Sequence, residues 1–311
     1  MVRKFIPAIC LSLLISTVLF AQIEEPVTLN TDTGNIEGTL LIPDTTVISP
    51  VALIIAGSGP TDRNGNNPAM TNNCLLMLAD SLAQHGIASL RYDKRGIAKS
   101  QSAGLDESQL RFEDYIQDAV GWIAYLRSDS RFGDIIVIGH SEGSLIGMIA
   151  SQQGAADKFI SLAGIAQTAD NIIREQLQTQ APAILAVANP ILDSLAQGKT
   201  VSDVPSTLYS LFRPSVQPYM ISWMKYDPTV EIAKLKIPVL IIQGTTDIQV
   251  KVKEAQALAK ANPEAQIRII DGMNHILKPA VADPQTNFKT YTDPNLPLMP
   301  EMVKSIVHFI K

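Results

Sequence analysis

DIIVIGHSEGSLIG, residues 134–147, is the stretch that decides the fold of this 311-residue chain. Residues 134–138 are rich in β-branched side chains, which is typical of a strand buried on both faces of a sheet. Residues 141–153 have a helical pattern, so strand and helix are joined by a very short turn. We expect Ser141 to adopt a strained backbone conformation there. Side chains in place of Gly139 and Gly143 would collide with the neighbouring strand and helix.

The rest of the chain repeats this alternation of strand and helix. Further apolar runs that predict buried strands occupy residues 51–56, 87–91, 159–163, 238–243 and 266–270. Helical patterns occupy residues 68–85, 110–127, 250–261 and 298–310. Ahead of them, the runs 27–30 and 35–41 flank a Thr-Asp-Thr-Gly turn and predict an antiparallel hairpin at the sheet edge. The fold class is therefore α/β, a mostly parallel twisted sheet flanked by helices with right-handed crossovers.

Residues 167–235 interrupt the alternation, because this stretch is too long for an ordinary crossover loop. It has helical patterns at residues 169–180 and 191–197, followed by a segment that contains Pro205, Pro214, Pro218 and Pro228. We interpret it as a helical insertion after the strand at 159–163, within one domain that spans residues 22–311. Its residues Met220, Trp223 and Met224 either form an apolar wall beside a site or pack into the core.

Composition and charge restrict the class of partner. The chain is 46% hydrophobic and 18% charged, which is typical of a globular protein with one large core. Its formal net charge is −5, and the 25 basic residues are scattered rather than clustered. Binding of nucleic acid requires a concentrated Lys/Arg surface, so we expect no nucleic-acid partner and favour a small-molecule ligand. No pattern in the sequence sets an oligomeric state.

The N-terminus has the pattern of a secretory signal peptide over residues 1–21. Arg3 and Lys4 precede an apolar run at 5–20, and the small residue Ala21 marks the expected cleavage edge. The alternative is an uncleaved membrane anchor, since the run is only slightly shorter than a spanning helix. Cleavage predicts an exported protein without stable membrane insertion. Cys74 is then the only thiol, and we expect it to be a buried apolar residue rather than a nucleophile.

Ser141 is the candidate nucleophile, and it needs a base and an acid. His275 lies in a loop after the last strand, whereas His85 and His308 fall within helical patterns and are read as structural. Asp247 comes just past the strand at 238–243 and is the preferred acid. Its rival Asp271 is only four residues from the histidine and is expected to brace that turn. The order Ser, Asp, His along the chain differs from the orders of chymotrypsin-like and subtilisin-like enzymes.

An oxyanion needs two backbone donors. One is the N–H of Glu142, the residue after the nucleophile, and the other is the N–H of Ser58 in the small-residue loop 56–60 that follows the first buried strand. This loop lacks the spacing of a phosphate-binding loop, which argues against a nucleotide.

Two further motifs carry a resemblance to a known family. GSGPTDRNGN at residues 57–66 and RYDKRG at residues 91–96, together with the triad candidates, resemble the α/β-hydrolase superfamily. Within it, the two motifs resemble the bacterial carboxylesterase branch related to serine aminopeptidase and dienelactone-hydrolase-like proteins. The resemblance implies esterases without a cofactor, with a small helical cap over the site, and we expect no metal site. Ala56 and Ala98 depart from the family pattern, where many relatives have histidine and glycine.

The expected function is cleavage of small acyl esters through a Ser-His-Asp triad and an acyl-enzyme. The machinery serves amides and thioesters as well, so an aminopeptidase is the main alternative, with a thioesterase or acyltransferase behind it. An aminopeptidase needs a site for the substrate amine, which only Glu142 or acidic residues of the insertion, such as Asp193 and Asp203, could supply. A non-catalytic binding protein on the same fold is a further alternative. The charged residues Arg63, Asp93, Lys94 and Arg95 are expected to form ion pairs and loop hydrogen bonds around the site.

Overall fold

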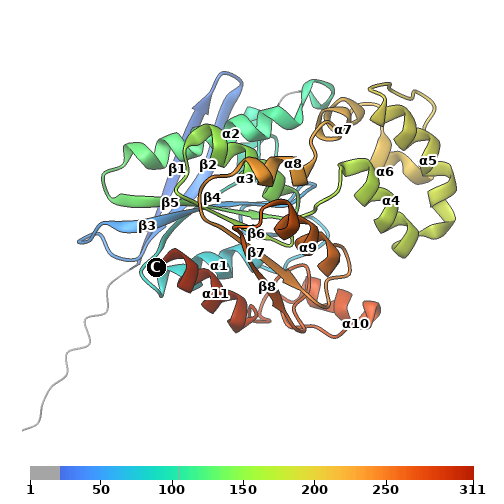
Figure 1. Cartoon of the computed structure of the whole chain (residues 1–311). Coiled ribbons are helices and arrows are strands. Elements are labelled where there is room, and N and C mark those ends of the chain that lie inside the picture. The colour runs from blue at the N-terminus through green and yellow to red at the C-terminus, as the bar shows by residue number, and fades with distance from the viewer. Residues whose placement is uncertain (1–21, 105) are drawn as a thin grey trace, which may run out of the picture.

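A computed structural model describes residues 22–104 and 106–311 (Figure 1). The signal-peptide prediction for residues 1–21 lies outside the described residues. Within them, no helix has the length and apolar character needed to cross a membrane.

A single eight-stranded sheet organises the described chain, in the order β1-β2-β4-β3-β5-β6-β7-β8. The predicted hairpin is confirmed and is longer than expected, because β1 (Ile23–Thr31) and β2 (Gly34–Ile42) pair along their full length. β2 also runs antiparallel to β4. From β4 onward, neighbouring strands are parallel, and these strands are β3 (Ser49–Ile55), β4 (Ala88–Tyr92), β5 (Phe132–His140), β6 (Lys158–Leu162), β7 (Val239–Gly244) and β8 (Gln266–Ile270).

The two faces of the sheet are covered by separate helix layers. Alternate residues of β3 show this directly, because Leu53 packs with α2 (Phe112–Ser128) and α3 (Glu142–Gly154) on one face. Ile54 packs on the other face with α1 (Cys74–Ala83) and α11 (Pro300–Ile310) (Figure 1). α9 (Val252–Ala261) joins the first layer. A strand buried on both faces must be apolar throughout, which explains the continuous runs seen in the sequence.

The expected helix at residues 68–85 starts too early, since α1 begins only at Cys74. The side-chain oxygen of Asn66 accepts hydrogen bonds from the backbone N–H groups of Asn72 and Asn73, both at 2.9 Å. Asn73 itself has a left-handed φ of 56°. These local bonds compete with the helical pattern and hold residues 68–73 as a loop.

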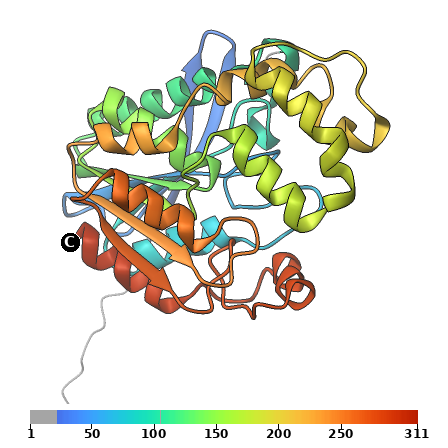
Figure 2. The ribbon, with the colours of Figure 1, turned by 45° about the vertical axis from the view of Figure 1, so that its right-hand side comes forward.

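The residues of the expected insertion form a succession of helices after β6. They are α4 (Ala169–Gln180), α5 (Pro182–Ala196), α6 (Tyr209–Phe212), α7 (Gln217–Trp223) and α8 (Pro228–Lys234). α5 begins nine residues before the helical pattern at 191–197. Figures 1 and 2 show α4 and α5 as a pair that stands away from the sheet. α8 differs, because it packs on the helix layer that covers the sheet. There the backbone carbonyl of Ile232 accepts a 3.0 Å hydrogen bond from the side-chain amide of Asn262, the residue after α9.

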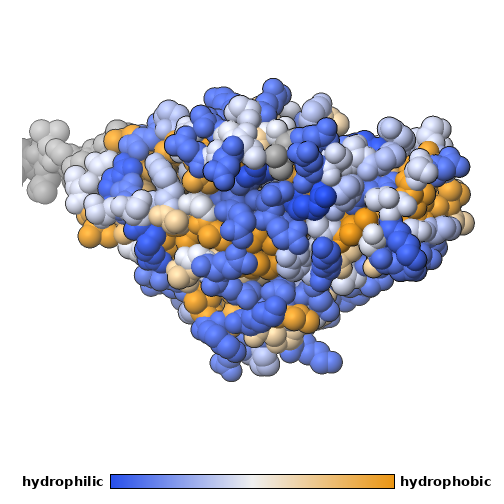
Figure 3. All heavy atoms as spheres, turned by 90° about the horizontal axis from the view of Figure 1, so that it is seen from above, coloured by the Kyte–Doolittle hydropathy of each residue, from blue (hydrophilic) through white to orange (hydrophobic). Residues whose placement is uncertain are grey.

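The outer helices of this segment carry exposed apolar side chains, among them Val187, Tyr209 and Leu211. In the view of Figure 3, scattered apolar patches interrupt a largely polar surface, and one of them lies at the end of the molecule that this segment forms. Met220 and Trp223 behave differently from these exposed residues. Both are buried and pack in the core, and the indole of Trp223 stacks on Phe112 with 6.1 Å between ring centroids.

Candidate active site

Ser141 lies at the turn between β5 and α3 and has the strained conformation that its sequence context predicts. Its φ is 55° and its ψ is −121°. A Cβ on Gly139 would lie 2.2 Å from the carbonyl oxygen of Gly143, and one on Gly143 would lie 2.5 Å from that of Ile55. Both positions therefore require glycine. Strain of this kind costs about 1–3 kcal/mol and persists only where the surrounding strand and helix enforce it.

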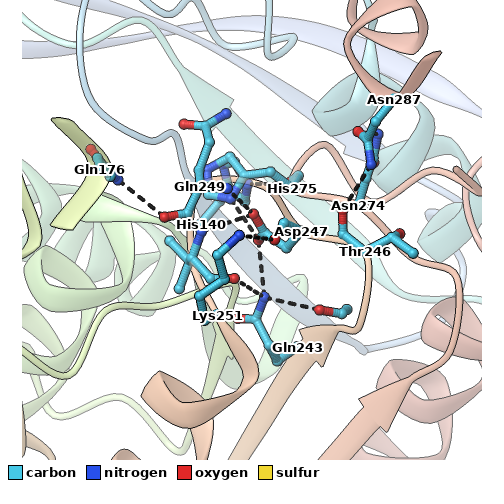
Figure 4. A network of polar contacts seen from close by, with 12 residues as sticks. His140, Gln176, Gln243, Thr246, Asp247, Gln249, Lys251, Asn274, His275 and Asn287 are labelled. Atoms are coloured by element: carbon cyan, nitrogen blue, oxygen red, sulfur yellow. Dashed lines mark hydrogen bonds and ion pairs between the residues drawn. The ribbon is translucent and has the colours of Figure 1, made fainter. Parts of the chain in front are cut away.

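His275 and Asp247 meet beside this turn, although 28 residues separate them in the chain. His275 Nδ1 lies 2.8 Å from Asp247 Oδ2, and both side chains are buried. The other carboxylate oxygen accepts backbone N–H bonds from Gln249 at 2.7 Å and from Val250 at 2.9 Å (Figure 4). Burial raises the pKa of Asp247, but the charge and hydrogen bond of His275 outweigh it and leave that pKa below its ordinary value. Asp247 is therefore ionised and fixes the ring of His275.

The rejected candidates lie elsewhere. Asp271 is exposed and accepts a 2.8 Å hydrogen bond from Thr245, so it braces the turn as expected. His85 is exposed, with Nδ1 2.8 Å from the carbonyl oxygen of Ser81. His308 is exposed on α11. The structure thus separates these three residues from Ser141 and brings only His275 and Asp247 together.

Ser141 and His275 open on one small cavity of about 110 Å³. The loop after β3 forms one wall, since Gly57 and Ser58 both line it. A Cβ on Gly57 would lie 3.1 Å from the Cβ of Ser141, so a side chain there would crowd the nucleophile. The other lining side chains are uncharged polar groups, together with a few apolar ones, and no carboxylate or lysine is among them. The main-chain N–H of Ser58 and that of Glu142, the first residue of α3, belong to the two segments that flank the nucleophile.

His140 is a residue of this site that sequence reasoning missed. It is buried, and its Nε2 lies 2.8 Å from the carbonyl oxygen of His275 (Figure 4). Burial, with a smaller effect of the His275 charge, lowers its pKa to about 4, so the ring is neutral at pH 7. A neutral ring facing a carbonyl must carry its proton on Nε2 and donate it. His140 therefore ties the turn at Ser141 to the loop that carries His275. The only sequence signal was its place beside the serine.

The charged residues near the site form ion pairs, as expected. Arg63 pairs with Asp93 at 2.7 Å, and Arg95 pairs with Asp118. Lys94 is buried, and its Nζ donates a 2.6 Å hydrogen bond to the carbonyl oxygen of Gly57.

The Glu142 carboxylate accepts a 2.5 Å hydrogen bond from Tyr219 and lies 3.5 Å from Lys94. Its polar partners are therefore side chains of the protein itself.

Cys74 is buried as expected, although it also lines the cavity at Ser141. Burial raises the pKa of its thiol to about 12, which leaves the thiol protonated and a poor nucleophile.

Comparison with known proteins finds one similar curated protein and several solved structures with a similar fold. Esterase EstD of Thermotoga maritima is 25% identical over 268 residues, which cover 82% of this chain. The chain spans only 60% of the length of that relative. The solved structure of Est1E from Butyrivibrio proteoclasticus with ferulic acid matches with a TM-score of 0.61 and 17% identity, over 91% of this chain and 98% of that one. The Pyrococcus furiosus esterase Pf2001 matches with a TM-score of 0.60 and 16% identity, over 93% and 91%. At these identities the structures show the fold alone.

A family model described as serine aminopeptidase, S33, matches residues 70–234. The match includes Ser141 and its turn, and ends before Asp247 and His275. It covers more than half of the chain, and the solved neighbours share the α/β-hydrolase fold. This chain therefore belongs to the serine aminopeptidase S33 family of the α/β-hydrolase superfamily.

Proposed function

We propose that the protein is a serine esterase that cleaves small acyl esters, with Ser141 as nucleophile, His275 as general base and Asp247 as the orienting acid. One observation carries the proposal. A serine in a strained turn between strand and helix opens on the same cavity as a buried histidine that is paired with an ionised carboxylate. This combination activates a hydroxyl for attack on a carbonyl carbon.

The reaction follows from these positions. His275 Nε2 takes the proton of the Ser141 hydroxyl while Oγ forms a bond to the substrate carbonyl carbon. The carbonyl electron pair moves to its oxygen, which the N–H groups of Ser58 and Glu142 stabilise. The C–O bond to the leaving group breaks, and His275 returns the proton to the departing alcohol. Water, deprotonated by the same histidine, then hydrolyses the acyl-enzyme. Asp247 stabilises the imidazolium at both stages.

The cavity favours an ester over a peptide. An aminopeptidase must hold a substrate ammonium, yet no carboxylate lines the cavity at Ser141. Glu142 is already paired with Lys94, and Asp193 is paired with Arg174 at 2.6 Å on the surface. Asp203 is exposed in the inserted segment. EstD and Pf2001 are named as esterases, which agrees with this choice. A cavity of about 110 Å³ suits a short acyl chain.

The export prediction is part of the proposal. Helices α4 to α7 are proposed as a cap beside the site. Residues 1–21 have the basic start, apolar run and terminal Ala21 of a signal peptide. N-terminal sequencing of protein recovered from the periplasm or medium tests the proposed export. A mature chain beginning at Gln22 supports it, and a chain retaining residues 1–21 in the membrane fraction contradicts it.

Turnover of matched substrates tests the activity. We expect measurable hydrolysis of p-nitrophenyl acetate or butyrate and far slower hydrolysis of an aminoacyl p-nitroanilide. Ser141→Ala should lower ester turnover by about 10⁴-fold or more, because a triad fails as a unit. Faster cleavage of the anilide would favour the aminopeptidase. Ordinary ester turnover by Ser141→Ala would exclude Ser141 as the nucleophile.

A further inference from the structure

A buried charged network contacts the loop that lines the Ser141 cavity, and it borders a separate cavity. Lys94, which follows β4, is 1% exposed. Its Nζ donates to the carbonyl oxygen of Gly57 at 2.6 Å, lies 3.5 Å from the carboxylate of Glu142, and sits 5.1 Å from the ring centre of Tyr115. Tyr219 of α7 donates to the same carboxylate at 2.5 Å.

The bond to Gly57 bears directly on the peptide that it shares with Ser58. In a trans peptide, the C=O of one residue and the N–H of the next point in opposite directions, and no described peptide bond is cis. Lys94 lines a second cavity with Gly59 and Pro60, whereas Ser58 lines the cavity of Ser141. Because Lys94 holds the Gly57 carbonyl, the Ser58 N–H points away from Lys94.

We propose that Lys94 is a positioning residue for the oxyanion site. It fixes and polarises the Gly57–Ser58 peptide through the Gly57 carbonyl, and it joins this loop to Glu142, whose own N–H is the second donor. The inference rests on the proposed esterase function and adds a part that the triad does not contain.

The energetics fit a functional role better than a stabilising one. A buried ammonium loses much of its hydration, which lowers the pKa of Lys94, and one carboxylate 3.5 Å away compensates only in part. Apolar residues of similar size often fill such a position at no loss of stability. A charged donor aimed at a single peptide bond has a use when that peptide must hold its orientation while negative charge develops on the substrate.

The test compares Lys94→Met with Lys94→Arg. Methionine keeps the apolar stem and removes the ammonium, whereas arginine restores a charged donor. For p-nitrophenyl acetate, we expect kcat of Lys94→Met to fall by about 10²-fold, the size of a lost oxyanion donor, with KM changed by less than about threefold. Lys94→Arg should recover part of the loss. Affinity for a boronic acid, whose tetrahedral adduct places an oxygen in the oxyanion site, should weaken in parallel with kcat/KM.

Lys158→Met is the matched control. Lys158 Nζ also donates to a backbone carbonyl, that of Ile310 at 2.6 Å, and lies 5.9 Å from the ring centre of Phe309. It begins β6, and it therefore lies at the opposite end of the parallel strands from Ser141, which follows the end of β5. We expect the kcat of Lys158→Met to stay within about twofold of wild type.

Each outcome decides between the two claims. Wild-type protein without Ser141-dependent turnover overturns the proposed function and this inference together. Wild-type protein that is active through Ser141, with unchanged kcat and boronate affinity in Lys94→Met, overturns the inference alone. A change confined to KM also overturns it. Where Lys94→Met does not fold by circular dichroism, Lys94→Gln retains a neutral donor, and equal kcat values for wild type, Lys94→Arg and Lys94→Gln contradict the role of the charge.

Discussion

The two cavities that border the loop with Gly57 and Ser58 differ in charge. On the side of Ser141, no charged residue of the described chain lines the cavity. The cavity on the side of Lys94 is lined by the buried Lys94 and Glu142 and also by Arg95, Glu107 and Arg213. We infer that the two cavities have different roles. In the proposed mechanism, proton transfer and attack take place in the neutral cavity, where the charge that develops in the transition state has no competing counter-ion. The proposed role of Lys94 and Glu142 is to hold the oxyanion donors in place.

The largest effect is expected on the neutral side, from Asp247→Asn. The variant keeps the shape of the residue but removes the charge that fixes the tautomer of His275 and stabilises its protonated form. We expect kcat for a short ester to fall by about 10⁴-fold. Asp271→Asn is the control, since Asp271 is exposed and contacts Thr245 rather than His275. Similar kcat values for the two variants would remove Asp247 from the proposed mechanism.

A second effect on this side concerns stability at acid pH and depends on His140. Its pKa is lowered to about 4 in the fold, whereas an unfolded histidine titrates near 6.5. Between these values the unfolded chain binds the proton and the folded chain does not, so stability falls as pH decreases from about 6.5 to 4, by about 3 kcal/mol in all. Urea unfolding of wild type and His140→Gln across this range measures the effect. The variant should lose this part of the pH dependence, and identical slopes would contradict a neutral, buried His140.

The smallest effect is expected on the charged side, from Tyr219→Phe. This change removes the hydroxyl that donates to Glu142 and leaves the bond from Lys94 to Gly57 intact. A hydrogen bond to a charged group contributes about 1.5–3 kcal/mol, so unfolding in urea should show a loss of that order. kcat should change by less than about threefold, because neither oxyanion donor loses its anchor. A fall in kcat as large as that of Lys94→Met would show that the inserted segment takes part in placing the donors.

Sequence reasoning located most strands and the sequence neighbourhood of the site. Buried parallel strands leave continuous apolar runs, and a Cβ on Gly139 would collide with Gly143 four residues away, so both are local signals. The same holds for Asp247 and His275, each placed just after a strand. The need for glycine at position 143 arises instead from Ile55 on the neighbouring strand β3. What the sequence did not reveal depends on long-range contacts. His140 meets the carbonyl of His275 across 135 residues, and Lys94 meets Gly57 across 37.

Local errors have a related cause. The loop at 68–73 has a helical pattern, but the side chain of Asn66 captures its backbone N–H groups and delays the start of α1. α5 extends back to Pro182, although the expected pattern began only at residue 191. The spacing of apolar residues predicts a helix, but it does not show which side chain forms a hydrogen bond with which backbone group.

Mass spectrometry of the protein after reaction with a fluorophosphonate tests the central claim most directly. The reagent forms a stable adduct only with an activated serine, so digestion and peptide mapping identify the nucleophile. We expect one adduct, on the peptide that contains Ser141, and none in folded Ser141→Ala. An adduct on another residue, or none on folded wild-type protein, would contradict it.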